Sequence, residues 1–199
     1  MHQLIQNLSC KREIFHSEAD FQHSLAWEMK LAVSHIDIRL EVPLIDKKYT
    51  DIVVIDSVTE EKFAIELKYP HTRSQFEVSG EKYSLGATSE TQQVSYNTIK
   101  DISRIEELRQ QKLVTRGFVI MISNTPDMWN AHTKKNQAAE FFLSDGIVLE
   151  GLRSVPTDRR GPFSKNSSIE LSGKYPVNWL DYSKLKGTFG HFKYLIIEI

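Results

Sequence analysis

The sequence contains few residues that could crosslink the chain or insert it into a membrane. Among its 199 residues there is one cysteine, Cys10, so neither an internal disulfide nor a Cys-x2-Cys zinc site can form. The longest apolar run, Phe118 to Ile122, is far shorter than the roughly 18 residues of a membrane span. The first ten residues lack a basic segment followed by a long apolar one. We therefore expect a cytoplasmic protein with no signal peptide and no membrane contact.

An excess of charge of one sign is also absent. The chain has 25 Lys and Arg residues against 26 Asp and Glu residues, a net charge of −1, which excludes a histone-like polycation. Nucleic-acid binding stays compatible with this balance if basic groups cluster on one face. Hydrophobic residues make up 40% and charged residues 26%, as in ordinary globular proteins. At about 150 residues per domain, we expect one domain over residues 1–199.

Periodicity predicts a helix, three strands, a helix and a strand in the first two thirds of the chain. Ser17 is a typical helix N-cap, with Asp20 placed for a weak capping box. The elements predicted after it are a helix ending near 34–35, strands at 36–44, 49–56 and 62–69, a helix at 89–111 and a strand at 117–123. This αβββαβ order predicts an α/β fold with one central mixed sheet flanked by helices and a core over about 15–123.

The other segments have weaker patterns. Residues 71–88 are polar and read as a loop. Thr125-Pro126-Asp127 favours a helix start, and we expect that helix to run to about Phe142. Residues 151–174 are rich in Gly, Pro, Arg and Ser and predict irregular surface, and residues 192–199 alternate as a late strand. The C-terminal part, 124–199, is thus predicted to contain a helix, an irregular segment and a strand.

Two acidic residues are predicted to face each other across the hairpin of the second and third strands. If its turn centres on residues 58–59, paired residue numbers sum to 117, so Asp51 lies opposite Glu66, with Lys68 on the same face. Like charges placed directly opposite are destabilising. A divalent cation between them would offset that cost, and Mg²⁺ is often held by one or two carboxylates plus water and phosphate.

The triplet Glu-x-Lys is a weak signal by itself. It occurs at 28–30, 60–62 and 66–68, and only the last lies inside a predicted strand with an acidic residue at the head of the strand before it. Charges on an alternating strand are more often a solvated face. That alternative stays open, although a solvated face would rather pair opposite charges.

The pattern of Asp51, Glu66 and Lys68 across two strands, after a helix that bears an acidic residue, resembles the PD-(D/E)xK nuclease superfamily, whose members are restriction-endonuclease-like. The resemblance covers about residues 15–123. The segments 17–27, 64–69 and 99–106 are also similar to a set of uncharacterised bacterial proteins of that class. Thr50 stands where the superfamily has a proline, at a position that varies.

The resemblance implies roles for individual residues. Asp51, Glu66 and the backbone carbonyl of Leu67 would hold Mg²⁺ or Mn²⁺, and Lys68 would act on the attacking water and the scissile phosphate. Glu18 would match an additional acidic residue that reaches the metal or its waters. A short Gln-x3-Tyr element of the exonuclease branch, which helps to bind substrate, is matched by Tyr96 together with Gln92, and Gln93 competes for that role. An ordinary helix face is the favoured explanation of Gln92 and Tyr96.

Three functions follow as hypotheses. The first is a metal-dependent nuclease that hydrolyses phosphodiester bonds, with DNA as the expected substrate and a homodimer as an open alternative to a monomer. The second is a non-catalytic module that binds nucleic acid or a partner on the same fold. The third is an unrelated α/β domain whose charges are surface decoration. All three groups expected of an enzyme, Asp51, Glu66 and Lys68, are present, which favours the first.

Overall fold

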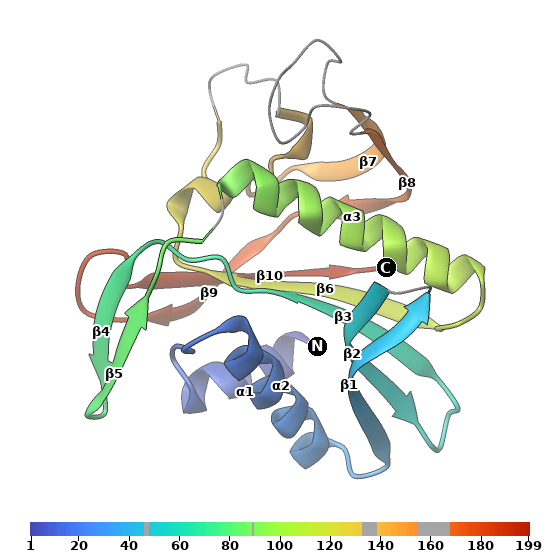
Figure 1. Ribbon diagram of the computed structural model, residues 1–199, viewed down its shortest axis with the longest axis horizontal. Helices are drawn as coiled ribbons and strands as arrows, with labels where there is room; N and C mark the ends of the chain where they lie inside the picture. The colour runs from blue at the N-terminus through green and yellow to red at the C-terminus, as the bar shows by residue number, and fades with distance from the viewer. Residues whose placement is uncertain (46–47, 89, 133–138, 155–167) are drawn as a thin grey trace.

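A mixed sheet forms the centre of the protein (Figure 1). The computed structural model describes residues 1–45, 48–88, 90–132, 139–154 and 168–199, and six strands within them form this sheet. β3 and β6 run parallel, and the other neighbouring pairs are antiparallel. In spatial order the strands are β1 (Ile36–Ile45), β2 (Lys48–Asp56), β3 (Lys62–Lys68), β6 (Arg116–Ser123), β10 (His191–Glu198) and β9 (Trp179–Lys184).

Helices cover both faces of the sheet. α1 (His2–Lys11) and α2 (Glu18–Ala32) lie on one face, and α3 (Thr91–Gln110) crosses the other (Figure 1). The remaining elements are the hairpin of β4 (Ser74–Val78) and β5 (Glu81–Leu85), the hairpin of β7 (Val148–Ser154) and β8 (Ser168–Pro176), and the 3-10 turns η1 (Pro126–Met128) and η2 (Ala139–Phe141). No helix in the described part of the chain is both long and apolar enough to cross a membrane.

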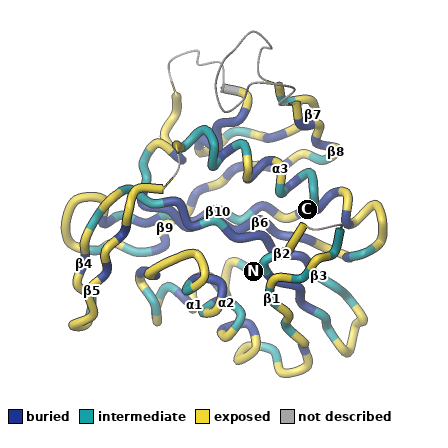
Figure 2. The backbone as a smooth tube through the Cα atoms, viewed as in Figure 1, coloured by how far each residue is buried: buried dark blue, intermediate teal, exposed yellow. Residues whose placement is uncertain are grey.

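Alternation along the strands divides the core into two clusters. On β6, Phe118 and Ile120 pack with α1 and α2, whereas Val119 packs with α3. Figure 2 shows the buried band that results along β6 and β10. On β3, Leu67 belongs to the first cluster, so its neighbour Glu66 points to the α3 side. The alternation of side chains along β3 therefore places Glu66 on the face of the sheet that α3 covers.

The α/β class and the helix-flanked mixed sheet are confirmed. Every helix and every strand predicted between Ser17 and Ser123 is present, with ends that differ by a few residues. The β2–β3 hairpin has the predicted register, in which Ile52 pairs with Ile65 and Val53 with Ala64. Turn length and alternation are local properties, so the sequence was sufficient to set this register.

The start of α2 differs from the predicted capping box in one contact. Ser17 Oγ accepts the Asp20 N–H at 3.1 Å, as an N-cap should. Asp20 Oδ2 does not return to the cap amide. It accepts the N–H of His16 at 2.9 Å and pairs with Arg12 at 2.7 Å instead. The carboxylate thus ties the segment before α2 to the helix start.

The expected loop at 71–88 is wrong, because β4 and β5 form a hairpin there, with Phe76 and Tyr83 buried. The expected helix at 125–142 is also wrong. After η1, the carbonyls of Trp129 and Asn130 accept bonds from Asp145 N–H and Ser144 Oγ, which fixes an irregular path. Residues 133–138 of that prediction lie outside the described residues.

The expected irregular surface at 151–174 is wrong at both ends, where β7 and β8 pair, and its residues 155–167 lie outside the described residues. Ile169 and Leu171 are buried at alternate positions of β8, a period that the surrounding polar residues obscured. The C-terminal part also contains β9, and the N-terminal part contains α1. Neither was predicted, since each buries only a few side chains.

Candidate active site

Asp51, Glu66 and Lys68 come together where β2 and β3 part. The backbone ladder between these strands runs from Ile55 and Lys62 to Ile52 and Ile65 and is not continued to Asp51. Beyond it, Asp51 Oδ2 accepts the N–H of Leu67 at 2.6 Å. The Asp51 side chain therefore satisfies a backbone donor that a continued ladder would have paired.

Glu66 is the most deeply buried of the three predicted side chains, with 2% of its surface exposed. Its Oε2 lies 2.5 Å from Arg104 Nη2, whereas its Oε1 is buried and has no hydrogen-bond partner among the described residues. Burial, and then the charge of Asp51, raises the pKa of Glu66 to about 8. Burial likewise raises the pKa of Asp51 to about 6, although the Leu67 N–H opposes this. Both carboxyls are thus held where their ionised forms are costly.

Lys68 is held by α3. Its Nζ lies 2.9 Å from Asp101 Oδ2 and donates to the carbonyl of Leu67 at 3.0 Å. Asp101 also contacts Arg104, one helical turn away, at 3.2 Å. Burial, the largest single cause, lowers the pKa of Lys68, but the charge and hydrogen bond of Asp101 together with the charges of Glu18 and Asp51 outweigh it, so the pKa is raised. Lys68 is therefore an ammonium at neutral pH.

A glycine on β6 sets the distance between α3 and these groups. A Cβ at Gly117 would overlap Ile105 of α3 and come close to the carbonyl of Ala64 on β3. With hydrogen in that place, α3 packs directly on β3 and β6. Asp101 and Arg104, on the same helix as Ile105, then reach Lys68 and Glu66.

Glu18, the first residue of α2, approaches from the end of β3. Its Oε2 accepts the N–H of Tyr69 at 2.8 Å. Its charge raises the pKa of Asp51 and of Lys68 among the smaller contributions. The structure thus brings the four predicted side chains of Glu18, Asp51, Glu66 and Lys68 into one neighbourhood, with Glu18 at its margin.

Two residues that sequence reasoning missed lie beside Asp51. Gln22 of α2 donates to the Asp51 carbonyl at 2.7 Å and to Glu41 Oε1 at 2.8 Å. Glu41 adds to the rise in the pKa of Asp51 and has a left-handed backbone, with φ of 52°. Such a conformation is unfavourable for a non-glycine residue, and backbone strain of this kind clusters at functional sites.

Asp101 and Arg104 were also missed, although a signal exists for them. They lie in the segment 99–106, between the buried residues Ile99, Ile102 and Ile105. Opposite charges three residues apart at the border of a buried stripe indicate a half-buried ion pair. Their partners on β3 depend on how the helix lies across the sheet, which no local pattern fixes.

The oxygen donors of this site fit a hard divalent cation. Two carboxylates, Asp51 and Glu66, and the carbonyl of Leu67 are ligands that Mg²⁺ and Mn²⁺ accept. The unpartnered Glu66 Oε1 is a free donor among them. Within the described ranges, however, no group of three or more His, Cys, Asp or Glu residues is arranged to hold a metal. A cation here would rest on two protein carboxylates and would compete with Arg104 for Glu66.

A basic cavity of about 400 Å³ opens beside these groups. Its lining consists of Lys48, Lys68, Asn97, Lys100, Asp101 and Arg104. Four cationic side chains surround one carboxylate there, which favours an anionic ligand. The cavity combines β2, β3 and α3, so it shares Lys68 and Arg104 with the carboxylate pair.

The residues predicted to bind substrate do not line this cavity, but two of them contact residues that do. Gln93 donates to Asn97 at 3.0 Å, and Lys100 Nζ lies 5.8 Å from the ring centre of Tyr96. Tyr96 also packs edge-on against Phe141. Gln92 is half-buried on the same helix. These side chains lie one turn before the cavity and can orient its lining.

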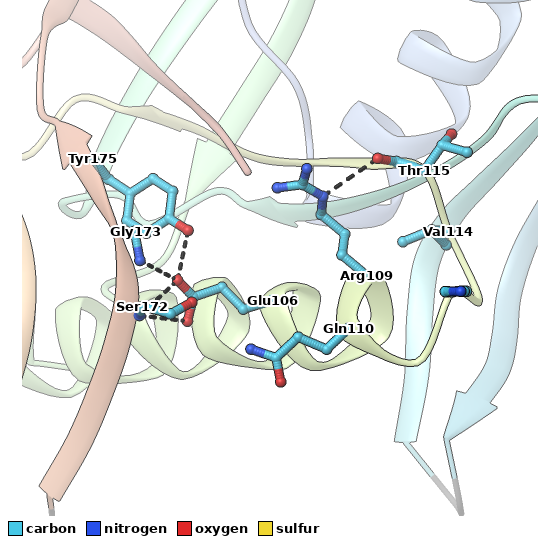
Figure 3. Close-up of a pocket in the computed structure, with 9 residues that line it drawn as sticks. Glu106, Arg109, Gln110, Val114, Thr115, Ser172, Gly173 and Tyr175 are labelled. Atoms are coloured by element: carbon cyan, nitrogen blue, oxygen red, sulfur yellow. Dashed lines mark hydrogen bonds between the residues drawn. The ribbon is translucent and has the colours of Figure 1, made fainter.

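A larger cavity of about 670 Å³ lies at the other end of α3 (Figure 3). Its acidic residue, Glu106, accepts the N–H groups of Ser172 and Gly173 and the hydroxyl of Tyr175 at 2.6 Å. Although burial opposes it, these donors lower the pKa of Glu106. The ionised carboxylate is fully engaged in holding β8 to α3, so we interpret it as a structural anchor.

The chain was compared with family models, with curated proteins and with solved structures, and it matches none of them. Any function of the protein is therefore inferred from the geometry and chemistry of the site itself.

Proposed function

We propose that this protein is a metal-dependent nuclease that hydrolyses phosphodiester bonds, with DNA as its substrate. The observation that carries the proposal is the buried pair of Asp51 and Glu66 beside Lys68. Two carboxyls whose ionised forms are disfavoured by burial and by each other destabilise the fold at neutral pH, and such groups concentrate at functional sites. The adjoining basic cavity supports a polyanionic substrate.

The arrangement of elements supports the same proposal. A helix, three antiparallel strands, a second helix and a strand parallel to β3 surround the site. That is the order of the restriction-endonuclease-like core which the sequence resemblance predicts. We propose that core for this chain, with α2 through β6 as its members.

The side chains have distinct proposed roles. Asp51, Glu66 and the Leu67 carbonyl would hold Mg²⁺ or Mn²⁺, which supplies charge at a phosphoryl oxygen and a hydroxide nucleophile at neutral pH. Lys68, whose ammonium form is favoured by Asp101 and the neighbouring carboxylates, would place a positive charge beside the scissile phosphate. Arg104 and Lys100 position the phosphate backbone from α3.

The test is cleavage of supercoiled plasmid and of a single-stranded oligonucleotide in Mg²⁺, Mn²⁺ or EDTA. We expect metal-dependent cutting that falls at least about 100-fold in Asp51→Asn and in Lys68→Ala, the scale of losing one charge stabiliser. Lys62→Ala is the matched control, since Lys62 lies on the same strand and face as Lys68 but at the other end of β3. Cutting by Asp51→Asn at the wild-type rate would contradict the assignment.

A non-catalytic binding module is the second candidate, and specific contacts favour it. Arg104 already pairs with Glu66, and Asp101 with Lys68, so Glu66 and Lys68 each have a partner of opposite charge without a metal. In that case the Asp51→Asn variant still binds DNA, as measured by fluorescence anisotropy in EDTA. Neither Mg²⁺ nor Mn²⁺ then supports cleavage. Binding without cutting in all three conditions selects this candidate.

A further inference from the structure

The two edges of the central sheet are treated differently by the rest of the chain. At β9, the hydroxyls of Tyr182 and Ser183 donate to the carbonyls of Arg12 and Glu13, in the segment after α1. At the opposite edge, within the described residues, β1 has β2 on one side and no strand on the other. An edge strand directs some of its backbone groups away from the sheet and is a template for pairing with another chain.

The hydrogen bonds around β1 show which of its backbone groups face outward. Ile36 of β1 lies opposite Asp56 of β2, but the N–H of Asp56 donates to the carbonyl of Glu61, on the β3 side. Ile36 and Asp56 are therefore a pair without mutual hydrogen bonds, and the N–H and C=O of Ile36 point away from β2. Lys30 Nζ reaches the outward carbonyl of Ile36 at 2.6 Å. By alternation, Ile38 also points its N–H and C=O outward, at the middle of the exposed edge.

Exposed apolar groups of α2 lie next to this edge. Trp27 is 70% exposed and Leu31 is 64% exposed, high values for side chains of this size. A groove of about 460 Å³ runs between helix and strand, and its apolar lining comes from Ala26, Trp27, Ile36, Ile38 and Leu40. Large exposed apolar groups beside a groove are typical of an interaction surface.

The charges on β1 are complementary to a second copy of the same strand. In an antiparallel pair related by a two-fold axis through Ile38, residue numbers sum to 76. Asp37 of each copy then lies opposite Arg39 of the other, and Ile36 lies opposite Leu40. Asp37 and Arg39 are 58% and 62% exposed, and the pair that they form among the described residues, at 3.0 Å, lies within one strand. The two-fold register creates two cross-strand ion pairs on one face and a continuous apolar row on the other.

We propose that β1 pairs with β1 of a second copy of this chain, which joins two central sheets into one across the dimer and covers Trp27. The exposed backbone of Ile38, the opposite charges at 37 and 39, and the exposed aromatic beside the edge all meet their complements in the same two-fold arrangement. This is an isologous interface, in which one patch serves both partners. It is independent of the proposed function and needs neither metal nor nucleic acid.

Charge reversal tests the pairing. The substitutions Asp37→Arg and Arg39→Asp each place like charges across the two-fold axis. At about 100 µM we expect the wild type to be a dimer by mass action and each variant to be a monomer, as measured by sedimentation velocity. An equimolar mixture of the two variants sets a doubly basic strand against a doubly acidic one, so we expect the dimer to return. Circular dichroism verifies the fold of each variant.

The matched control is Glu198→Arg, which reverses the similarly exposed pair of Arg116 and Glu198 at 3.6 Å on other strands and should leave the dimer intact. A monomeric wild type at this concentration overturns the proposal. So does a dimer that persists in either single variant, because the interface must then lie elsewhere. A mixture that stays monomeric also overturns it, because the register would be wrong.

Discussion

At the scale of single residues, the proposed active site contains two carboxyls whose ionised forms are costly in the folded protein. Glu66 and Asp51 have pKa values of about 8 and about 6, raised chiefly by burial. The folded protein therefore holds protons that the unfolded chain releases between about pH 4 and pH 8. By linkage, the stability that these groups contribute is fully present below pH 4 and is lost as pH rises through 6 and 8.

Replacing Glu66 by a neutral residue should remove part of the loss of stability at high pH. We expect Glu66→Gln, measured in EDTA, to be more stable than the wild type at pH 8 by about 1 kcal/mol or more, since one pKa unit corresponds to 1.36 kcal/mol. At pH 4, where Glu66 is protonated, the two proteins should unfold at similar denaturant concentrations. Glu77→Gln, on the exposed face of β4, is the control and should not alter the pH dependence. A variant that loses stability at pH 8 would contradict the pKa of Glu66.

How much of the site could be predicted depends on how far apart its residues are in the chain. Asp51, Glu66 and Lys68 were found because a short turn and period-two alternation fix a hairpin register from local sequence. Asp101 and Arg104 were not predicted, because they reach Lys68 and Glu66 through the packing of α3 across β3 and β6. The residues predicted to bind substrate, Gln92, Gln93 and Tyr96, lie about one helical turn before the α3 residues that line the basic cavity, and that placement also depends on how α3 crosses the sheet.

At the scale of elements, the contact between α3 and the sheet depends on Gly117. We expect Gly117→Ala to destabilise the protein by about 1–3 kcal/mol, the usual cost of overpacking a core, because the new methyl overlaps Ile105. Ile105→Ala in the same chain should recover part of that loss, which a double-mutant cycle measures. Activity should fall too, because α3 carries Arg104 and Asp101.

Gly86→Ala is the matched control for this change. A Cβ at Gly86 meets nothing within 4 Å, so urea unfolding should give a midpoint close to that of the wild type. If Gly117→Ala unfolds at the wild-type midpoint as well, the close approach of α3 does not limit stability.

Elements with a continuous period were predictable and the others were not. The strands β3 and β6 bury most of their side chains, β2 buries four of its nine residues, and β10 is mostly apolar. By contrast, β5 buries only Tyr83 and Leu85, which the polar residues around it conceal. The irregular path after Pro126 follows from long-range bonds to Trp129 and Asn130, which no local propensity contains.

At the scale of the whole molecule, a net charge of −1 means that attraction to a polyanion has to be local. We expect DNA binding in EDTA to weaken with salt, and Lys48→Gln and Lys100→Gln each to reduce the slope of log K against log salt by about 1, as for lost phosphate contacts. Both residues line the basic cavity. Lys62→Gln, outside it, should leave the slope unchanged, and equal slopes in all four proteins would place the nucleic acid elsewhere.

The position of β10 governs the order in which the molecule can assemble. It comes after the other described strands in the sequence, yet it lies between β6 and β9, and the N–H and carbonyl of Gly117 both bond to Ile199. Until β10 has been synthesised, β6 has β3 as its neighbour on one side and an open edge on the other. Pairing over such long loops is slow, and open edges are prone to association. Completion of the central sheet is therefore expected to wait until residues 191–199 have been synthesised.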